Sequence, residues 1–414
     1  METKLYKEIT KCRCCGSGNL KEYLDLGEQP LANDYHNGTA DQDVFPLKAL
    51  FCPTCSHSQL SVVVDPDILF RHYLYVSGTS TTLRDYFEFF AEFAVEMYWA
   101  AFRAPPNSIL DIACNDGSQL DAFKHHQFRT IGVDPAKNLT PIAKAKGHEI
   151  LTDYWTPDTA EVLFNRSGPI DILVAQNVFA HTHDVLWFLR ACQKVMDKKS
   201  VLFIQTSQAE MIRRNEFDTM YHEHLSFFNV KSMQTLIQSA GLSLDAVYKT
   251  AIHGTSYVFI ISLHGIEFPD NDTVERELKL EHAEGLGDFA TYEQFATNAI
   301  HCTQTLKHRV ANHRKAGKQV VGYGAAAKGN TVLNFGDIEL DYIIDDSSLK
   351  QGLLTPGTNI PICGRQKLLD DPSDKVFVPL AWNFFDEIAQ KVNECTGTSN
   401  TFIRYFPTFE EVVI

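Results

Sequence analysis

Short apolar segments separated by amphipathic or loop segments most constrain the fold of this 414-residue chain. They are rich in Ile, Val and Leu, as strands buried on both faces are. Because strands that alternate with helical patterns form parallel sheets covered by helices, the pattern predicts an α/β fold. The predicted strands are Ser108–Ile112, Thr130–Val133, Ile170–Ala175, Val201–Thr206 and Val258–Leu263 in one series, and Gln319–Tyr323, Tyr342–Ile344 and Val376–Leu380 in a second.

Two cysteine pairs of the form CxxC lie near the start of the chain. Cys12 and Cys15 form the first pair, and Cys52 and Cys55 form the second. A tetrahedral zinc ion takes four thiolates at about 2.3 Å, and a two-residue turn presents each pair in that geometry. We therefore expect one structural zinc ion, with Cys14 as a non-ligand, that stabilises folding and does no chemistry. Two unrelated cysteine clusters are the alternative.

The charge balance limits the partners of the chain. Its net charge is 37 − 52 = −15, whereas nucleic acids and anionic membranes need a basic footprint, so neither is expected as a partner. The richest apolar stretch, 86–102, carries Glu88, Glu92 and Glu96 on one helical face, which is typical of an amphipathic helix and not of a membrane span. The residues after Met1 are polar, which predicts no signal peptide and a cytoplasmic protein. No pattern indicates an oligomeric state.

Three domains are predicted, because a single hydrophobic core stops growing near ~250–300 residues. Residues 1–72 are rich in cysteines and turns, and they form the predicted zinc-binding domain. A central α/β domain is expected over 73–265. A second α/β domain is expected over 266–414, and it includes a long helical pattern over 288–316 that stops at Gly317.

The turn after the first strand of the central domain has the character of an adenosine-cofactor site. The strand carries Asp111 and runs into the polar turn Asn115-Asp-Gly117, and the next strand ends in Asp134. An acid at the end of the second strand bonds ribose hydroxyls in doubly wound folds. Only Gly117 remains of the G-x-G-x-x-G pattern that cradles a pyrophosphate, so S-adenosylmethionine fits better than a dinucleotide. A structural turn without a ligand is the alternative.

Polar residues follow another predicted strand of the same sheet. Asn177 and His181 come after the strand that ends near Ala175, at the edge where doubly wound folds place ligands. They share a face if the segment is helical. We interpret them as candidates for the site, and purely structural roles stay open.

A third polar cluster is Tyr221-His222-Glu223-His224. It does not match H-E-x-x-H, which needs histidines four residues apart, so a zinc protease is excluded. A carboxylate beside an imidazole is what proton abstraction needs, with pKa values set by burial. The alternative is a polar loop whose groups are satisfied by its own backbone.

Motifs along almost the whole chain resemble one family, the S-adenosylmethionine-dependent nucleotide-sugar C-methyltransferases. The matching segments are Cys12–Cys15, Leu26–Asn33, Cys52–Cys55, Tyr75–Ser80, Asn115–Gly117, Asn177–His181, Glu216–Ser226, His253–Ser256, Tyr323–Thr331, Leu333–Asn334, Lys350–Gly352, Pro356–Thr358 and Ala381–Asn383. The chain departs from the family at Ala113, where a glycine is usual, and at Gly254-Thr255, where Gly-Gly is common.

The resemblance implies a fold and an activity. The fold is a small N-terminal zinc-binding domain, a central class I methyltransferase doubly wound sheet, and a C-terminal Rossmann-like α/β domain that helps to enclose the nucleotide-sugar. The activity is methyl transfer from S-adenosylmethionine to carbon 3 of a nucleotide diphosphate 4-keto-6-deoxy or 2,6-dideoxy hexose, through an enolate. The product is a branched-chain sugar for a glycan, a lipopolysaccharide or a natural product.

The resemblance, read with this chemistry, also assigns residues. We expect His224 to be the base, with Glu223 orienting it or sharing the proton. The expected catalytic residues are His224, Glu223, Tyr221 and His181. The expected cofactor-binding residues are Asp111, Asn115, Gly117, Asp134 and Asn177. The expected substrate-binding residues are Tyr75, Ser77, Thr79, Asn177, His222, Lys328 and Asn330.

Two other functions compete with this interpretation. Gly322-x-Gly324-x-x-Ala327 follows an apolar strand, and Asp345 lies about 20 residues further on. Taken alone, this is a dinucleotide fingerprint, and it favours a nicotinamide-dependent nucleotide-sugar oxidoreductase. The other competitor is a non-catalytic protein that binds a sugar nucleotide. The polar cluster at 221–224 argues against the non-catalytic protein.

Overall fold

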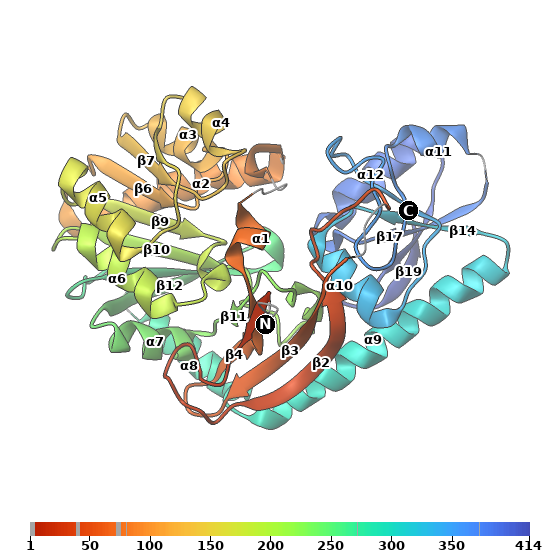
Figure 1. Ribbon diagram of the computed structural model, residues 1–414, viewed down its shortest axis with the longest axis horizontal. Helices are drawn as coiled ribbons and strands as arrows, with labels where there is room; N and C mark the ends of the chain where they lie inside the picture. Colours follow the sequence, from red (N-terminus) through yellow and green to blue (C-terminus); the bar gives the residue numbers. More distant parts are fainter. Residues whose placement is uncertain (1–4, 39–41, 72–75, 80, 271, 372) are drawn as a thin grey trace.

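The computed structural model of the protein describes residues 5–38, 42–71, 76–79, 81–270, 272–371 and 373–414. Two α/β lobes flank an antiparallel N-terminal sheet, and one long helix runs along the base of the molecule from lobe to lobe (Figure 1). Within the described ranges, no helix combines the length and the apolar character that crossing a membrane requires.

The central lobe contains a seven-stranded mixed sheet. All strands run parallel except β13, which is antiparallel to both of its neighbours. The predicted strand at 258–263 is present as β13, and its antiparallel direction makes the sheet mixed. The order across the sheet is β12 (Ser243–Thr250), β13 (Ser256–Ser262), β10 (Val201–Thr206), β9 (Ile172–Gln176), β6 (Ser108–Ile112), β7 (Arg129–Val133) and β8 (Glu149–Leu151).

Helices cover both faces of this sheet, because side chains alternate along each strand. Ile109 on β6 points into a core with α2 and α3, whereas Leu110 belongs to a core with α5, α6 and α7 on the other face. The central-lobe helices are α2 (Thr81–Phe102), α3 (Ser118–Lys124), α4 (Thr140–Ala145), α5 (Pro157–Ser167), α6 (Val185–Val195) and α7 (Val230–Ser239). This layering places the carboxyl ends of β6, β7 and β9 at one open edge.

The C-terminal lobe repeats the same principle with six strands. Its strands are parallel except for the last pair, and helices α10 (Ala327–Gly336), α11 (Gln366–Asp370) and α12 (Phe385–Thr396) pack around them. The order is β16 (Ile362–Cys363), β15 (Tyr342–Ile344), β14 (Gln319–Tyr323), β17 (Lys375–Pro379), β18 (Thr401–Arg404) and β19 (Glu410–Val413). The carboxyl ends of β14 and β17 face the central lobe across a cavity.

Two helices join the lobes. α9 (Phe289–Lys315) ends one residue before the predicted stop, and Gly317 has the positive φ of +81° that a helix-terminating glycine adopts. α8 (Thr273–Ala283) follows the predicted domain boundary at 265 yet packs on the central lobe, where Glu281 accepts hydrogen bonds from the first backbone N–H groups of α7. α8 therefore contacts the central lobe although it lies beyond residue 265.

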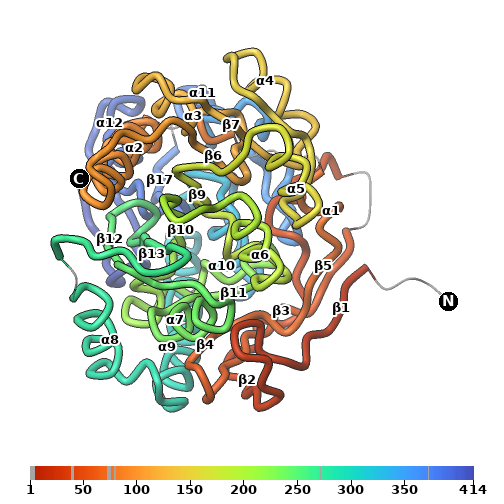
Figure 2. The backbone as a smooth tube through the Cα atoms, turned by 90° about the vertical axis from the view of Figure 1, so that its left-hand side faces the viewer, coloured from red at the N-terminus to blue at the C-terminus, as the bar shows by residue number. Residues whose placement is uncertain are grey.

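The N-terminal sheet connects all parts of the chain. Its order is β11 (Ser226–Phe227), β4 (His57–Leu60), β3 (Val44–Cys52) and β2 (Lys21–Pro30). β11 belongs to the central part of the sequence, directly after the Tyr221–His224 cluster, and it pairs with β4. Turning the molecule shows β3, β4 and β11 side by side, next to β1 (Tyr6–Glu8), β5 (Val62–Val64) and α1 (Pro66–Phe70) (Figure 2). The polar cluster is thus tied to the cysteine-rich domain.

Candidate active site and metal centre

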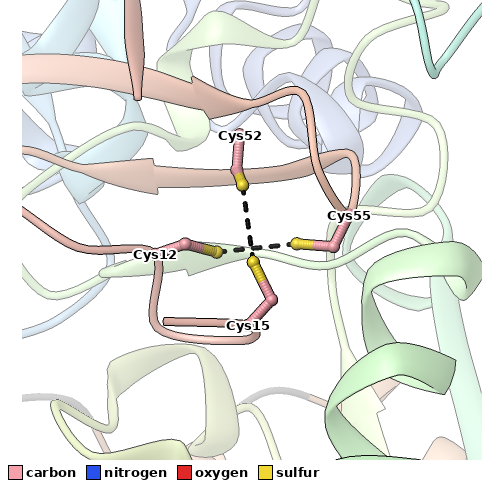
Figure 3. A group of neighbouring side chains, drawn as sticks. All are labelled: Cys12, Cys15, Cys52 and Cys55. Atoms are coloured by element: carbon pink, nitrogen blue, oxygen red, sulfur yellow. Dashed lines mark hydrogen bonds between the residues drawn. The ribbon is translucent and has the colours of Figure 1, made fainter. Parts of the chain in front are cut away.

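The four predicted zinc ligands converge on one point. Cys12 and Cys15 lie on one turn, Cys52 ends β3, and Cys55 follows in the next turn (Figure 3). Their sulfur atoms all lie within 4.8 Å of one another, with 3.5 Å between Cys12 and Cys55 and 3.6 Å between Cys15 and Cys52. Four sulfurs at about 2.3 Å from a tetrahedral ion would be about 3.8 Å apart, so the group fits zinc.

This metal centre is a structural one. Four thiolates leave no open coordination position, so the ion would stabilise the fold. Cys14 is buried beside the group but is not a member of it, in agreement with its interpretation as a non-ligand. Arg13, on the same turn, donates from its guanidinium to the carbonyl oxygens of Leu60 and Leu225 at 3.1 and 2.9 Å. The zinc turn therefore supports the backbone next to His224.

A cavity of about 520 Å³ lies where the three parts of the chain meet. This volume is in the range of small-molecule and cofactor sites. Its lining contains Asn33 from the N-terminal part, the polar edge of the central sheet, and residues that follow β14 and β17 in the C-terminal lobe. The predicted site residues that line it are Ser77, Asp111, Asn115, Asp134, Asn177, His181, Tyr221, His224 and Lys328.

Asp134 organises the edge of this cavity where the cofactor is expected to bind. One of its carboxylate oxygens accepts the backbone N–H of Asn115 at 2.8 Å, and the other accepts that of Ala136 at 2.7 Å. The carboxylate thereby fixes the turn after β6, and Asp134 lines the cavity. The arrangement fits S-adenosylmethionine, because a buried carboxylate and the apolar residues Leu83 and Phe87 line the same cavity.

The turn itself packs closely. Gly117 has a φ of +79°, and a Cβ there would lie 3.0 Å from Ala143 of α4, so this glycine serves packing and does not line the cavity. Ala113, where the family usually has glycine, has a φ of +64°. A left-handed conformation costs an L-residue roughly 1–2 kcal/mol.

Burial, with Asp134 and Asp116 nearby, raises the pKa of Asp111 well above its usual range.

Substitution of Asp134 tests the cofactor edge. Asp134→Ala removes an acceptor for the ribose and the anchor of the turn, so we expect S-adenosylhomocysteine to bind at least tenfold to a hundredfold more weakly. That range corresponds to the roughly 1.5–3 kcal/mol of a charged hydrogen bond. Isothermal titration calorimetry measures the change, with Asp153→Ala, also on the cavity wall, as the comparison. An unchanged dissociation constant for Asp134→Ala would place the adenosine elsewhere.

His224 is held as a neutral imidazole with a defined tautomer. Its Nδ1 lies 2.7 Å from the carbonyl oxygen of Thr219, which can only accept, so Nδ1 carries the hydrogen. Its Nε2 lies 2.9 Å from the phenolic oxygen of Tyr221 and accepts from it. Burial, followed by the nearby His181, lowers the pKa of His224 well below 6.5. The ring is therefore ready to accept a proton at Nε2.

His181 lies next to this pair. Its ring is 4.9 Å from that of His224 and is stacked on Phe70 at 5.8 Å. Burial lowers the pKa of His181 to about 4, so it too is neutral near pH 7. Asn177 has a φ of +53° at the end of β9 and lies on the same wall of the cavity. The structure thus brings Asn177, His181, Tyr221 and His224 together.

Other predicted residues lie outside the cavity lining. Glu223 is buried and accepts a 2.5 Å hydrogen bond from the amide of Asn33, whereas the imidazole of His224 is oriented by Thr219. His222 is buried with its ring 5.7 Å from that of Phe45. These side chains join the polar cluster to the N-terminal domain.

Asn330 also serves as a connection between domains. It is buried on α10, and its amide donates to the carbonyl of Ala32 at 2.7 Å. Ser77, before α2, reaches the cofactor turn, where its backbone N–H donates to Asn115 at 3.0 Å. Tyr75 lies outside the described residues, and the side chain of Thr79 is likewise not among them.

Lys328 brings a cation to the cavity from the C-terminal lobe. It is the second residue of α10, whose N-terminus has no side-chain cap. Its ammonium nitrogen is buried, has no hydrogen-bond partner in the described part of the chain, and lies 5.1 Å from the ring centre of Trp382. A helix N-terminus and a buried cation together favour an anionic ligand.

Several lining residues were not predicted as site residues. His253 is half-buried with a φ of +57°, and desolvation lowers its pKa to about 4. His253, Lys350 and Asn383 lie in segments that matched the family, so the motifs themselves could have indicated them. Asp153 and Gln119 had no such indication, because β8 is too short to be recognised and Gln119 lies inside a helix.

The dinucleotide-like loop of the C-terminal lobe has a packing explanation. A Cβ on Gly322 would lie 2.8 Å from Ile343, and one on Gly324, where φ is +84°, would lie 2.9 Å from Ala381. Both oxygens of Asp345 accept backbone N–H groups, from Ala325 and from Ser347. The glycines and the acid are thus accounted for by the turn's own structure.

Comparisons with known proteins agree with this architecture. Three family models match consecutive parts of the chain: "Putative zinc binding domain" over residues 12–70, "Methyltransferase domain" over 79–247 and "C-methyltransferase C-terminal domain" over 251–407. The C-methyltransferase NovU of Streptomyces niveus is 28% identical over 410 residues, which cover 97% of each chain.

Other similarities cover less of the chain. A ubiquinone biosynthesis O-methyltransferase of Bartonella tribocorum is 32% identical over 100 residues, 24% of this chain and 40% of its own. Among solved structures, the plantazolicin methyltransferase BpumL in complex with SAH has a TM-score of 0.35 at 12% identity, covering 44% of this chain and 88% of its own. Magnesium protoporphyrin IX methyltransferase of Synechocystis PCC 6803 has a TM-score of 0.33 at 11% identity, covering 46% and 85%. At these scores the structural likeness carries no weight.

The chain is an S-adenosylmethionine-dependent C-methyltransferase with an N-terminal four-cysteine zinc domain. The C-terminal lobe that carries the dinucleotide-like loop matches a C-methyltransferase domain, so the oxidoreductase interpretation is set aside. The central lobe matches a methyltransferase domain, which sets aside the non-catalytic interpretation.

Proposed function

We propose that the protein methylates carbon 3 of a nucleotide-linked 4-keto-deoxyhexose in the cytoplasm. The observation that carries the proposal is the set of groups that line one cavity. It combines the expected cofactor edge at Asp134, the neutral His224 with its Tyr221 partner, and the buried ammonium of Lys328, which has no hydrogen-bond partner among the described residues. A carbon acid, an enolate and a diphosphate are the substrate features that need such groups. The domain boundaries at 72 and 265 belong to the same proposal.

The base and the enolate need different partners. Nε2 of His224 accepts the proton of carbon 3, and the electron pair of that C–H bond moves to the oxygen of the 4-ketone. The phenol of Tyr221, freed from Nε2 when the imidazole is protonated, can donate to the enolate oxygen. Thr219 keeps the imidazole oriented during this step through its carbonyl, and the same carbonyl stabilises the imidazolium.

The bound cofactor supplies an electrophilic methyl group on a sulfonium. Asp134, Asn115 and Asp111 would hold it, and the methyl group would be transferred from it to carbon 3. The 4-ketone is restored as the new carbon–carbon bond forms. His224 then returns its proton to solvent.

The charged end of the substrate fits the C-terminal lobe. Lys328 and the uncapped N-terminus of α10 lie on one wall, and Lys350, also on this wall, donates to the carbonyl of Ala325 at 2.6 Å. A diphosphate placed here would accept a hydrogen bond from the ammonium of Lys328, which makes none within the described part of the chain and interacts only electrostatically with Glu216 and Asp218 there. The acidic chain thus binds an anion through a few local donors.

A substrate panel tests the proposal. Methyl transfer from labelled S-adenosylmethionine is measured with several nucleotide-linked 4-keto-deoxyhexoses, with the same sugars free of nucleotide, and with nucleotide-linked glucose, which lacks the ketone. We expect labelled product only from nucleotide-linked ketones. Transfer to a phenol or hydroxyl acceptor, with none to any ketone of the panel, would contradict it.

Lys328→Met refines the assignment of the diphosphate. We expect the KM for the nucleotide-linked ketone to rise by about tenfold or more, because a charge-assisted contact of roughly 1.5–3 kcal/mol is lost. Affinity for S-adenosylhomocysteine should stay the same. Lys318→Met, at an exposed pair with Asp374, is the matched control. A rise in KM for Lys318→Met of equal size would remove the special role of Lys328.

A further inference from the structure

The segment 216–224, called here the catalytic segment, is held from the C-terminal lobe by two hydrogen bonds. Asp218 lies in the short 3-10 helix η3 (Phe217–Thr219) and is fully buried. The indole Nε1 of Trp382 donates to its carboxylate at 2.6 Å. The hydroxyl of Thr331, on α10, donates to the carbonyl of Met220 at 3.1 Å.

These two hydrogen bonds hold the residues on either side of Thr219, whose carbonyl orients the proposed base His224. Thr219 stands between Asp218 and Met220, and its carbonyl oxygen accepts the Nδ1–H of His224 at 2.7 Å. A rotation of the peptide unit at Thr219 would turn the imidazole and move Nε2 away from Tyr221. Both neighbours of Thr219 are thus fixed by side chains of the other lobe.

Trp382 also contacts the cation of the cavity. Its ring centre lies 5.1 Å from the ammonium of Lys328, so the indole face supports the cation while the indole edge supports Asp218. The ring is closely enclosed, because a Cβ on Gly254 would lie 3.2 Å from it. Trp382 is itself buried and lies outside the cavity lining. Any effect of Trp382 on the site must therefore pass through the residues that it contacts.

We propose that Trp382 is a positioning residue that fixes the orientation of His224 through Asp218 and Thr219, with Thr331 as a second tie. The C-terminal lobe then has a role in proton removal in addition to enclosing the substrate. This inference rests on the proposed function for its kinetic test. Its structural test does not.

The kinetic test uses Trp382→Phe, which keeps a buried aromatic ring and removes the donor. We expect kcat to fall about tenfold to a hundredfold, since small displacements of a catalytic group have effects of this size. The KM for the ketone and the affinity for S-adenosylhomocysteine should change less than about threefold. Thr331→Val should lower kcat less, and Asp218→Asn, which keeps an oxygen acceptor for the indole, should retain most of the activity.

Tyr405→Phe is the matched control. Tyr405 is buried in the same lobe and donates to the carbonyl of Leu380 at 3.2 Å, and among the described residues its hydroxyl makes no hydrogen bond to the catalytic segment. We expect its kcat to be unchanged. Equal kcat for Trp382→Phe and Tyr405→Phe would overturn the proposal, as would a loss for Trp382→Phe that appears only in KM.

Hydrogen exchange gives a readout that needs no substrate. Amides of the catalytic segment should exchange faster in Trp382→Phe than in the wild-type protein or in Tyr405→Phe, with the strands of the central sheet unchanged. Unaltered exchange over 216–224 would overturn the proposed positioning of the catalytic segment by Trp382, even if kcat fell. If the wild-type protein methylates no ketone of the panel, the proposed function fails, and this measurement still decides the inference.

Discussion

His224→Ala is expected to abolish methylation and to stop exchange of the carbon 3 proton with solvent. The wild-type enzyme saturated with S-adenosylhomocysteine has no transferable methyl group, so it should exchange that proton for deuterium in D₂O, as NMR of the keto-sugar would show. Loss of a general base typically costs ~10²–10⁴-fold in rate. Both losses should be in this range, because Nε2 of His224 is the basic atom that the structure presents beside Tyr221.

Two variants separate the base from its surroundings. Asp134→Ala should spare exchange at saturating S-adenosylhomocysteine, since it affects cofactor binding and not proton removal. Tyr221→Phe keeps Nε2 and removes the phenol, so exchange should slow but persist. Exchange that survives in His224→Ala at the wild-type rate would pass the role of base to Tyr221 or Glu223.

The pH dependence follows from the environment of His224. Burial lowers its pKa well below 6.5 in the folded protein. The base is therefore protonated and inactive only at pH values below that lowered pKa, and neutral and active above it. The acid limb of kcat/KM, which reports the free enzyme, should accordingly lie well below pH 6.5. A limb centred at or above 6.5 would contradict the assignment.

Local patterns predicted the parts of the fold that are buried on both faces. β6, β10, β14 and α9 lie within one or two residues of their predicted positions, because continuous apolar runs and a terminal glycine are local features. The direction of β13 was not predictable from its residues, since periodicity carries no information on strand direction. The pairing of β11 with β4 joins residues 226 and 59, and such long-range contacts leave no mark on either short segment.

The same division holds for the site. The acid of Asp134 and the cysteine pairs are tied to chain-local turns, and they lie where such turns would put them. Glu223 was expected to orient His224 or to share its proton, and the structure adds a contact that was not predicted, from Nδ1 of His224 to the carbonyl of Thr219, five residues away. Backbone carbonyls have no sequence signature, so this contact could not be read from residue types.

Loss of the zinc ion is expected to remove the folded N-terminal domain. Structural zinc contributes apparent binding free energies of about 10–16 kcal/mol in small zinc domains, and that energy is folding energy because the ligands are not preassembled in the unfolded chain. Elemental analysis should give one zinc per chain. Cys52→Ser should lose the zinc and most of the soluble yield, since Cys52 is fully buried.

Cys14→Ser provides a control within the same turn. Cys14 is buried beside the ligands but outside the four-sulfur group, so its variant should keep one zinc and a nearly normal yield. The soluble yield of Cys52→Ser should fall by a larger factor than the kcat of the molecules that do fold, because a closed four-cysteine site does no chemistry. Arg13 connects the metal centre to the candidate active site, because its guanidinium donates to the carbonyl of Leu225, the residue after His224. A zinc-free wild-type protein that keeps its melting temperature would refute the structural role of the metal.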